Sequence, residues 1–372
     1  MKTTLSHNSR INQGSGRIEV VPFRELTADQ LSTWNKIQSA DGGLDSPFFR
    51  AEFARVVDQI RGGVEVAFVE EDGREVAFFP FERRWGHVGY PVGCGMSDFH
   101  GMIIRPGYAV DPRRLLRSCG LTAWHFNHLA RRASAFEPYE WTVRNSPYID
   151  TSAGFASYCA SRNDAGVKAI KQSFQKLRKL EREVGCAHFE INTSDPFVLK
   201  SLMAWKSTQC HRTLVIDYFS ISWIDRLFRR LIEFSDKALC GMVSALRVGD
   251  ELLAATYCMR SNGVLHLWAT AYNPAFARYS PGYQVLLKLI EAAPSLGVTR
   301  IDLGTGPERF KQSLMTGTVP VSEGAVDRVP GAHSMRRLWR STRHLVRETA
   351  LRDATRTPWR LFCLLRDQHV YR

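Results

Sequence analysis

A helix that begins directly after a strand carries the strongest chemical signal in the sequence. Asn273-Pro274 ends the apolar run at 264–271, and after a polar loop Ser280-Pro281-Gly282 predicts a helix start, because serine caps a first turn and proline there loses no helical hydrogen bond. Backbone N–H groups at such a start point outward, and Gly282 has no side chain to block them. The expected chemistry is anion binding, with a pyrophosphate as a suitable ligand and Arg278 as an additional cation. The alternative is that these residues only start a helix.

The elements around this helix start are predicted to form one α/β unit. The segment ALCGMVSALRVGDELLAATYCMR predicts two strands joined by a turn at Gly249-Asp250, and the run at 264–271 predicts a third. The helix that follows has apolar residues at three- and four-residue spacing, which gives it one face to pack on a sheet. VTRIDLG then predicts a fourth strand. The predicted anion site therefore lies beside a sheet.

The first part of the chain shows a similar order. Two helices are expected at 23–37 and 47–60, followed by a hairpin about Asp72-Gly73, a strand in DFHGMII, a helix start at Asp111-Pro112 and a strand in LTAWHFNHL. The turns at positions 72 and 249 are 177 residues apart, and the helix starts at positions 111 and 280 are 169 apart. This nearly constant offset indicates an internal duplication. Because the Asp111 carboxylate would repel a phosphate, we expect only the second copy to bind a cofactor.

Length and composition favour two domains. A chain of 372 residues with 44% hydrophobic and 11% aromatic residues can form two sizeable cores. We expect a disordered N-terminus at 1–16, domains at 17–150 and 151–330, and a basic amphipathic helical tail at 331–372. The N-terminal residues lack the apolar segment of a signal peptide, and no run approaches the ~20 apolar residues of a membrane span. The expected location is the cytoplasm.

The cysteines and histidines do not predict a metal site. The eight cysteines are scattered without a CxxC pair, as expected for small buried side chains in a cytosolic protein. His125 and His128, with Cys119 nearby, lack a fourth ligand and lie in a predicted strand. We therefore expect no bound metal.

The net charge of +13 is concentrated at the C-terminus. Residues 331–372 contain ten arginines and three acidic residues, interspersed with tryptophans and leucines. An interfacial helix pair on the anionic inner face of a membrane would have this composition, and so would helices packed on the domain with arginines at their flanks. The excess charge indicates an acidic partner, which is a membrane surface, a nucleic acid or an anionic substrate.

Several motifs together resemble one known family. They are KQSFQKLRKLEREVG, LKSLMAWKSTQCHRT, Tyr272-Asn273-Pro274, SPG at 280–282 and DLGTGPERFK at 302–311, with SPFF at 46–49 and SDFHG at 97–101 in the first part. Residues of about 160–315 resemble the BioF2-like or CelD-like branch of the GNAT N-acetyltransferases, which is related to the Fem peptidoglycan transferases. The resemblance implies an α/β (α+β) fold of tandem GNAT-like units, with mixed, mostly antiparallel sheets flanked by helices. It also implies that acyl-CoA, such as acetyl-CoA, is the co-substrate.

The resemblance implies a cofactor site at the predicted helix start. The CoA pyrophosphate would lie on the amides from Arg278 to Tyr283, which include Tyr279, Ser280 and Gly282. The pantetheine arm would run beside the strand at 266–271. Lys311 is expected to hold a phosphate or an acidic acceptor.

The same resemblance suggests catalytic and acceptor residues. Asp302 and Glu308 are candidate bases, although Asp302 would equally serve as a structural cap of the turn at 304–306. The family commonly has Tyr-Lys where this chain has Phe310-Lys311, so either the CoA thiolate leaves unaided or another tyrosine, Tyr272, Tyr279 or Tyr283, donates its proton. His266 is a third candidate base, and a buried structural histidine is the simpler explanation.

A predicted basic helix at 165–184 lies next to the proposed active domain. Its cations, Arg178 among them, either form a solvated surface or contact an acidic acceptor or the 3′-phosphate of CoA. Trp205 and Lys206 on the next helix are expected to line the acceptor side.

Three functions follow from these expectations. The first is an acyl-CoA-dependent N-acyltransferase that acylates an amine, such as a glycan precursor, in exopolysaccharide or cell-envelope biosynthesis. The second is a Fem-like transferase that uses aminoacyl-tRNA and contacts RNA through the basic helix. The third is a non-catalytic accessory protein of polysaccharide synthesis, suggested by Phe310.

Overall fold

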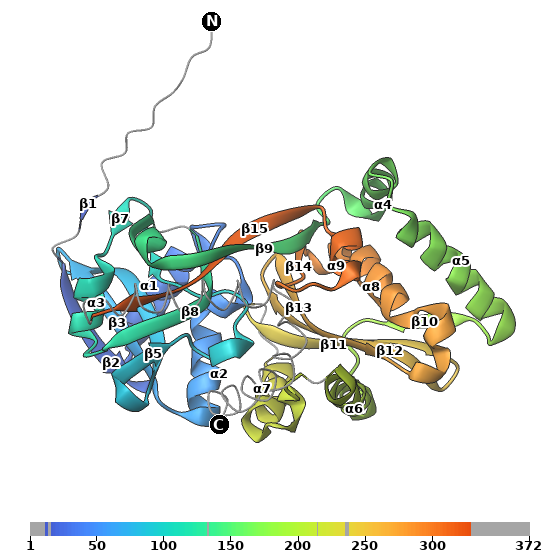
Figure 1. Cartoon of the computed structure of the whole chain (residues 1–372), viewed down its shortest axis with the longest axis horizontal. Coiled ribbons are helices and arrows are strands. Elements are labelled where there is room, and N and C mark those ends of the chain that lie inside the picture. The colour runs from blue at the N-terminus through green and yellow to red at the C-terminus, as the bar shows by residue number, and fades with distance from the viewer. Residues whose placement is uncertain (1–11, 14–15, 132–133, 214, 235–237, 329–372) are drawn as a thin grey trace, which may run out of the picture. The chain divides into compact units, whose positions relative to one another are not determined.

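The described chain divides into two compact units (Figure 1). A computed structural model describes residues 12–13, 16–131, 134–213, 215–234 and 238–328. The first unit contains the described residues up to Leu44, Val57–Val143 and those from Val321 onward, and the second contains Asp45–Val56 and Arg144–Pro320. Each unit thus includes a short segment from the other half of the chain, unlike the sequential domains at 17–150 and 151–330. Residues 1–11 of the expected disordered N-terminus and the whole basic tail at 331–372 lie outside the described residues.

The first unit is a mostly antiparallel sheet with helices. Its strand order is β2-β3-β4-β5-β8-β15, and β6 pairs with β4. The strands are β2 (Arg17–Pro22), β3 (Val64–Glu71), β4 (Arg74–Arg84), β5 (Val88–Tyr90), β6 (Ile103–Ile104), β8 (Ala123–Ala130) and β15 (Gly317–Asp327), and a separate parallel pair joins β1 (Asn12–Gln13) to β7 (Tyr108–Ala109). The helices are α1 (Ala28–Ser39), α3 (Pro112–Ser118) and the second half of α2 (Ala51–Arg61).

The second unit has the same architecture. Its strand order is β10-β11-β12-β13-β14-β9. The strands are β9 (Glu140–Asp150), β10 (Ala187–Glu190), β11 (Cys240–Val248), β12 (Glu251–Ser261), β13 (Val264–Tyr272) and β14 (Arg300–Asp302). The helices are α4 (Gly154–Asp164), α5 (Lys168–Glu183), α6 (Pro196–Thr213), α7 (Ser222–Glu233), α8 (Pro281–Ala292) and α9 (Arg309–Leu314).

The two units follow one topology, as the expected duplication requires. In each, a hairpin is extended by an antiparallel third strand, and a helix then leads to a fourth strand parallel to the third. The last strand of each sheet comes from the other half of the sequence: β9 pairs Asp150 with Arg300, and β15 pairs Asp327 with Ala123. The sequence does not predict either strand, because their partners are more than a hundred residues away and no local turn marks the pairing.

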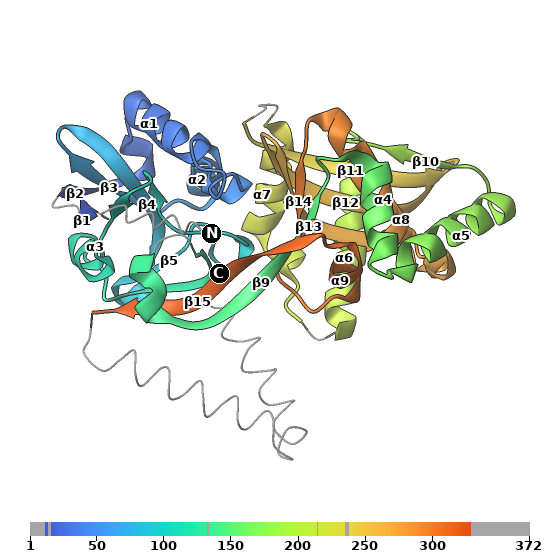
Figure 2. The same ribbon diagram turned by 90° about the horizontal axis from the view of Figure 1, so that it is seen from above.

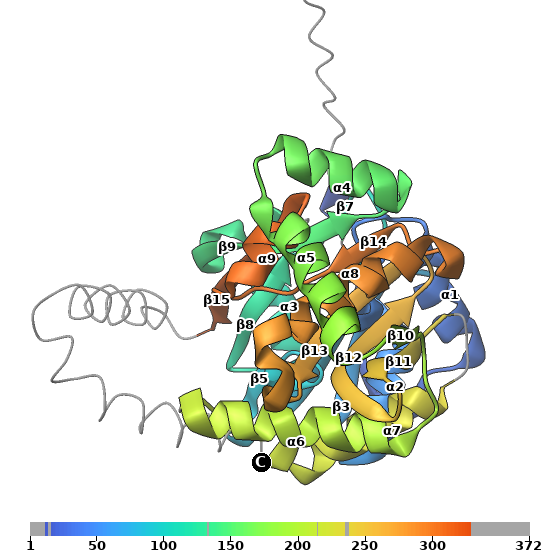
Figure 3. The same ribbon diagram turned by 90° about the vertical axis from the view of Figure 1, so that its right-hand side faces the viewer.

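Helices cover both faces of the sheet in the second unit. Figures 1 and 3 show α8 on one face of β11–β13 and α6 and α7 on the other. The α8 face holds an apolar core that includes Leu286, Ile290 and Leu265. The α8 stripe predicted from the three- and four-residue spacing is therefore confirmed, because an apolar helix face gains free energy by covering a sheet. On α5, Ile170 and Leu180 are buried.

The sheet of the first unit is also covered on both faces. Trp34 of α1 stacks on Phe78 of β4 at a ring-centroid distance of 5.2 Å. The next residue, Phe79, belongs to the core that contains Leu115 and Leu116 of α3. Because successive residues of a strand point to opposite faces, α1 and α3 lie on opposite sides of the sheet (Figure 2).

Several predicted elements are shorter or differ locally. The strand expected in DFHGMII is limited to Ile103–Ile104, Arg50 interrupts the helix expected at 47–60, and the loop before α8 forms a 3-10 turn, Pro274–Tyr279. The cysteines in the described ranges are free thiols, and Cys363 lies outside those ranges. None of the described helices combines the length and the apolar character that crossing a membrane needs.

Candidate functional site

A cavity opens in the second unit where two parallel strands part. The pairing of β14 with β13 ends at His266 and Asp302, but β13 continues to Tyr272. The edge of β13 beyond His266 faces a cavity of about 340 Å³. The lining comes from β13, α6, the start of α8, the end of β14 and α9. It consists of Lys206, Gln209, Leu267, Trp268, Ala269, Thr270, Tyr272, Ala277, Ser280, Gly282, Tyr283, Leu286, Leu303, Glu308, Phe310 and Lys311.

The start of α8 contributes a backbone donor to this cavity. Ser280 has a left-handed backbone (φ 55°), and its side chain makes no capping bond, so the predicted capping role is wrong. Instead, the Ser280 carbonyl accepts the amides of Tyr283 and Gln284, at 3.0 and 3.3 Å. The Gly282 N–H has no acceptor among the described residues. A single amide of the first turn is thus available to a ligand, with the positive end of the helix dipole behind it.

A lysine of α5 reaches the same helix start. Lys176 Nζ donates to Ser280 Oγ over 2.7 Å. The left-handed backbone of Ser280 directs its hydroxyl to this lysine rather than to the amides of α8. A full positive charge therefore lies beside the free amide of Gly282, which strengthens the site for an anion.

Gly282 lies in close contact with its neighbour Tyr272. A Cβ built on Gly282 would lie 3.0 Å from Cδ1 of the Tyr272 ring. Tyr272 lines the cavity and is 42% exposed. Glycine at this position therefore lets the aromatic ring pack against the helix start, while the amide stays accessible.

Tyr283 brings a phenol to α9. Its hydroxyl lies 3.2 Å from Ser313 Oγ, and Ser313 Oγ donates to the carbonyl of Phe310 over 2.9 Å. Burial raises the pKa of Tyr283, and the Ser313 hydroxyl opposes the rise. Phe310 has no hydroxyl group. The Tyr283 hydroxyl of α8, however, reaches α9 at Ser313, about one turn after Phe310.

Two lysines and a glutamate line another part of the cavity. Lys311 Nζ lies 3.2 Å from Glu308 Oε2 and donates to the Thr305 carbonyl over 2.9 Å. Lys206 Nζ, from α6, lies 3.4 Å from Gln209 Oε1. Burial lowers the pKa of Lys206; Cys210 and Glu308 oppose the shift, and Lys311 adds to it. The three charged groups are thus electrostatically coupled.

Asp302, a predicted base, is not among the residues that line the cavity. Its carboxylate is buried, and Arg300 Nε donates to it over 2.9 Å. The same guanidinium binds Asp45 over 3.0 Å. This arrangement ties the end of β14 to the segment at 45–56.

Four other predicted residues lie outside the cavity lining. The Tyr279 side chain is buried and donates to Glu183 over 2.8 Å, with the Arg278 guanidinium 4.6 Å from its ring centroid. Trp205 is half-buried on α6, and Arg178 is exposed on α5. The cavity thus brings together the predicted residues Lys206, Tyr272, Ser280, Gly282, Tyr283, Glu308 and Lys311.

An aromatic cluster supports β13 beside the cavity, and sequence reasoning missed most of it. Trp268 stacks on Phe228 of α7 with centroids 4.7 Å apart, and Phe48 contacts both Trp268 and His266, at 5.6 and 4.9 Å. Phe53 of α2 also lies against Trp268. Phe48 is part of the SPFF motif, which was the only available signal. His266 is buried, consistent with the structural alternative for this histidine. In the described ranges, no cluster of three potential metal ligands occurs.

Comparison with known proteins identifies the fold around this cavity. Residues 168–312 match a family model described as an acetyltransferase (GNAT) domain. None of the curated protein sequences compared with the chain matches it significantly.

Solved structures show the same architecture over most of the chain. FemX is 9% identical, with a TM-score of 0.55, and the match covers 86% of this chain and 99% of FemX. The C-terminal domain of a proposed lysylphosphatidylglycerol synthetase from Agrobacterium fabrum is 13% identical, with a TM-score of 0.50, covering 85% of this chain and 96% of the domain. A conserved protein of unknown function from Bacteroides thetaiotaomicron is 10% identical, with a TM-score of 0.51, covering 84% of this chain and 100% of that protein.

These identities establish the fold and leave the acceptor open. The chain therefore has a GNAT-type acyltransferase fold, and the match to the acetyltransferase domain falls on the unit that contains the cavity.

Proposed function

We propose that the second unit is an acyl-CoA-dependent N-acyltransferase whose cofactor binds in the cavity beside β13. One observation carries the proposal: β13 extends past the end of β14, and its edge shares a cavity with the start of α8. A pantetheine arm carries amide groups, which can bind to a strand edge as an added strand would. A diphosphate suits a helix start, where N–H groups and the dipole favour negative charge.

Two kinds of group at the start of α8, a backbone amide and cationic side chains, would bind the diphosphate. The amides of Ser280, Tyr283 and Gln284 already bind carbonyl groups, which leaves the Gly282 amide for the ligand. Lys176 supplies a positive charge at Ser280, and Arg278 is partly exposed nearby on the same turn. We therefore assign the diphosphate to Gly282 and these cations rather than to a series of amides.

The groups around the cavity suit acyl transfer to an amine. The amine nitrogen attacks the thioester carbonyl carbon, so that a C–N bond forms, the C–S bond breaks and the CoA thiolate leaves. Glu308 is the carboxylate in the cavity lining, and we assign it the proton that the attacking amine loses. Tyr283 carries its phenol proton at neutral pH, as an ordinary tyrosine does, and burial raises its pKa further; we assign it as the donor to the thiolate.

The acceptor class also belongs to the proposal. The resemblance to the BioF2-like and CelD-like branch supports an amine of a glycan precursor used in exopolysaccharide or cell-envelope synthesis. The match of residues 168–312 supports acyl transfer itself and is independent of this finer assignment.

Calorimetric titration of acetyl-CoA tests the cofactor site. We expect the wild-type protein to bind with a dissociation constant in the micromolar range, and Gly282→Glu to bind at least about a hundredfold more weakly, because its carboxylate repels the diphosphate and its side chain meets Tyr272. Gly42→Glu is the matched control, since a Cβ there meets no atom within 4 Å.

The alternative functions give different results. Absence of acetyl-CoA binding to the wild-type protein would contradict the proposal. Salt-dependent binding of aminoacyl-tRNA by such a protein would instead favour the Fem-like transferase, whose RNA contact would lie on the exposed cations of α5. Binding of neither would favour the accessory protein.

A further inference from the structure

We propose that the acceptor amine carries an anionic group, a carboxylate or a phosphate, which Lys206 and Lys311 bind in the cavity. This inference rests on the proposed function and specifies its substrate class. The charged residues of the cavity lining are Lys206, Lys311 and Glu308. When all three are ionised, the lining has one positive charge in excess.

Lys206 carries the uncompensated charge. Glu308 is already in contact with Lys311 at 3.2 Å. Lys206 forms no ion pair in the described part of the chain, and its ammonium donates a hydrogen bond to the neutral amide of Gln209. A partly buried ammonium without a paired carboxylate costs free energy. A ligand with a negative charge would remove that cost on binding, which makes this lysine a selective contact.

The backbone turn at Gly306 holds Lys311 and Glu308 in place in the same cavity lining as Lys206. Gly306 has a φ of 154°, and a Cβ there would lie 2.0 Å from Glu308 Oε2 and 2.8 Å from Lys311 Nζ. Only glycine therefore permits both side chains to fold over this turn. Lys311 is further fixed by its bond to the Thr305 carbonyl, so its ammonium is positioned before any ligand binds.

The phosphates of CoA do not account for these lysines. The proposed diphosphate site is at α8, and Lys206 comes from α6, which covers the opposite face of the sheet (Figures 1 and 3). In acyl-CoA the pantetheine arm separates the phosphates from the thioester, so one cofactor does not place its phosphates at both positions. The lysines therefore remain for the second substrate, whose amine must approach the thioester.

Three small amines provide a direct test by calorimetry on the full chain saturated with CoA. O-phosphoethanolamine and β-alanine carry a phosphate and a carboxylate, respectively, and ethanolamine carries a hydroxyl group. We expect at least one of the anionic amines to bind about tenfold or more tightly than ethanolamine, as a charge-assisted hydrogen bond to lysine predicts. The phosphate and carboxylate arms identify which anion is preferred.

Matched lysine variants locate the effect. Lys206→Met should abolish the preference, and Lys200→Met, on the exposed face of the same helix, should retain it. Urea denaturation of both variants checks that they are folded. The inference is overturned if the three amines bind alike, if none binds, or if the preference survives in Lys206→Met.

Acetyl-CoA titration of the same proteins separates this inference from the proposed function. If acetyl-CoA binds wild type and Lys206→Met equally while the amines are not distinguished, only the acceptor inference fails. If acetyl-CoA does not bind the wild type, the proposed function fails.

Discussion

The two units share one topology and differ at the point where the third and fourth strands meet. In the second unit β13 and β14 part, and a cavity lies between them. In the first unit β5 ends at Tyr90, and the chain returns at His100 to bridge Leu129 of β8. His100 exchanges backbone hydrogen bonds with His128 and Ala130, at 3.1 and 3.0 Å. The chain itself thus occupies in the first unit the place where the second unit is open to a ligand.

The helix starts show the same contrast. In the first unit the Asp111 carboxylate accepts the amides of Arg113 and Arg114 at 3.0 and 3.3 Å. In the second unit the corresponding residue, Ser280, makes no capping bond, and Gly282 keeps a free amide in the described structure. One helix start therefore carries its own anion, and the other is available for an external one.

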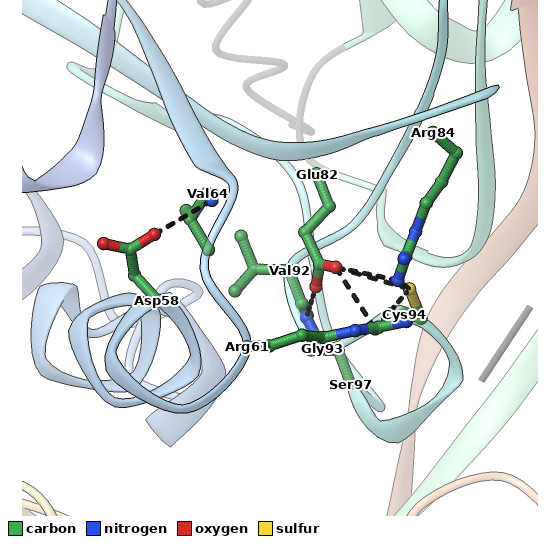
Figure 4. Close-up of polar contacts among 9 residues, drawn as sticks. All are labelled: Asp58, Arg61, Val64, Glu82, Arg84, Val92, Gly93, Cys94 and Ser97. Carbon is green, nitrogen blue, oxygen red and sulfur yellow. Dashed lines mark hydrogen bonds and ion pairs between the residues drawn. The ribbon is translucent and has the colours of Figure 1, made fainter. Parts of the chain in front are cut away.

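The carboxylates of the two units differ in the same way. Glu82 of β4 is buried and accepts from Arg61, Arg84 and the Gly93 amide, at 3.2, 3.0 and 2.7 Å (Figure 4). This cluster fixes the turn at Gly93 and Cys94, from which the chain returns to His100. Burial and Glu82 raise the pKa of the adjacent Cys94 thiol, and Arg84 and Arg61 oppose the rise. Glu308, by contrast, has a half-exposed side chain in the cavity lining.

The largest expected effect is the loss of stability in Glu82→Gln. The amide keeps the shape of the carboxylate but leaves the guanidinium groups of Arg61 and Arg84 without its charge. We expect the free energy of unfolding to fall by about 3 kcal/mol, as for breaking a buried ion pair. Urea denaturation measures the change, and acetyl-CoA affinity should remain within about twofold of wild type. A loss of affinity without a loss of stability would show that the first unit takes part in cofactor binding.

Glu308→Gln is the matched change in the second unit. Its half-exposed contact with Lys311 contributes less than about 1 kcal/mol to stability, so the unfolding midpoint should hardly move. The kcat of acyl transfer should fall about a hundredfold, because the amide does not accept the proton of the amine. A pH–rate profile that keeps its acidic limb in the variant would assign the base to another group.

Local signals predicted the elements that frame the site. The turns at Asp72-Gly73 and Gly249-Asp250 lie where the hairpins bend, and both Asp72 and Gly249 have positive φ angles. Proline at position 281 marks the start of α8. These signals succeed because each depends on the conformational preference of one or two residues.

The sequence does not predict the contacts between distant segments. Arg300 binds Asp45 across 255 residues, and Phe48 packs on Trp268 from the same early segment. Neither contact has a local pattern, so the sequence does not show that the Arg300 guanidinium, which binds Asp302, is also bound by Asp45. The returning segment at His100 was likewise expected to be a longer strand, because its apolar residues do not reveal which strand they join.

A smaller effect is expected from Asp111→Ser, which gives the first unit the helix-start residue of the second. Loss of the carboxylate cap should lower the free energy of unfolding by about 1 kcal/mol or less. No second acetyl-CoA site should appear in calorimetry, because His100 still fills the space between the strands. A stoichiometry of two would mean that the cap alone distinguishes the units.

The smallest expected effect is that Lys206 takes up a fraction of a proton when an anion binds. This behaviour distinguishes Lys206 from Arg84 of the first unit. Burial lowers the pKa of Lys206, so it loses its proton at a lower pH than an ordinary lysine. Anion binding through Lys206 should therefore be strongest below this lowered pKa and weaken as the pH rises through it. An anion favours the charged lysine and raises its pKa, so binding in that pH range takes up a fraction of a proton. Calorimetry of β-alanine binding in buffers of different ionisation enthalpy measures the uptake, and the difference between wild type and Lys206→Met removes the contribution of the ligand. Equal uptake by the two proteins would assign the titrating group elsewhere, whereas Arg84 beside Glu82 has a raised pKa and stays charged throughout this range.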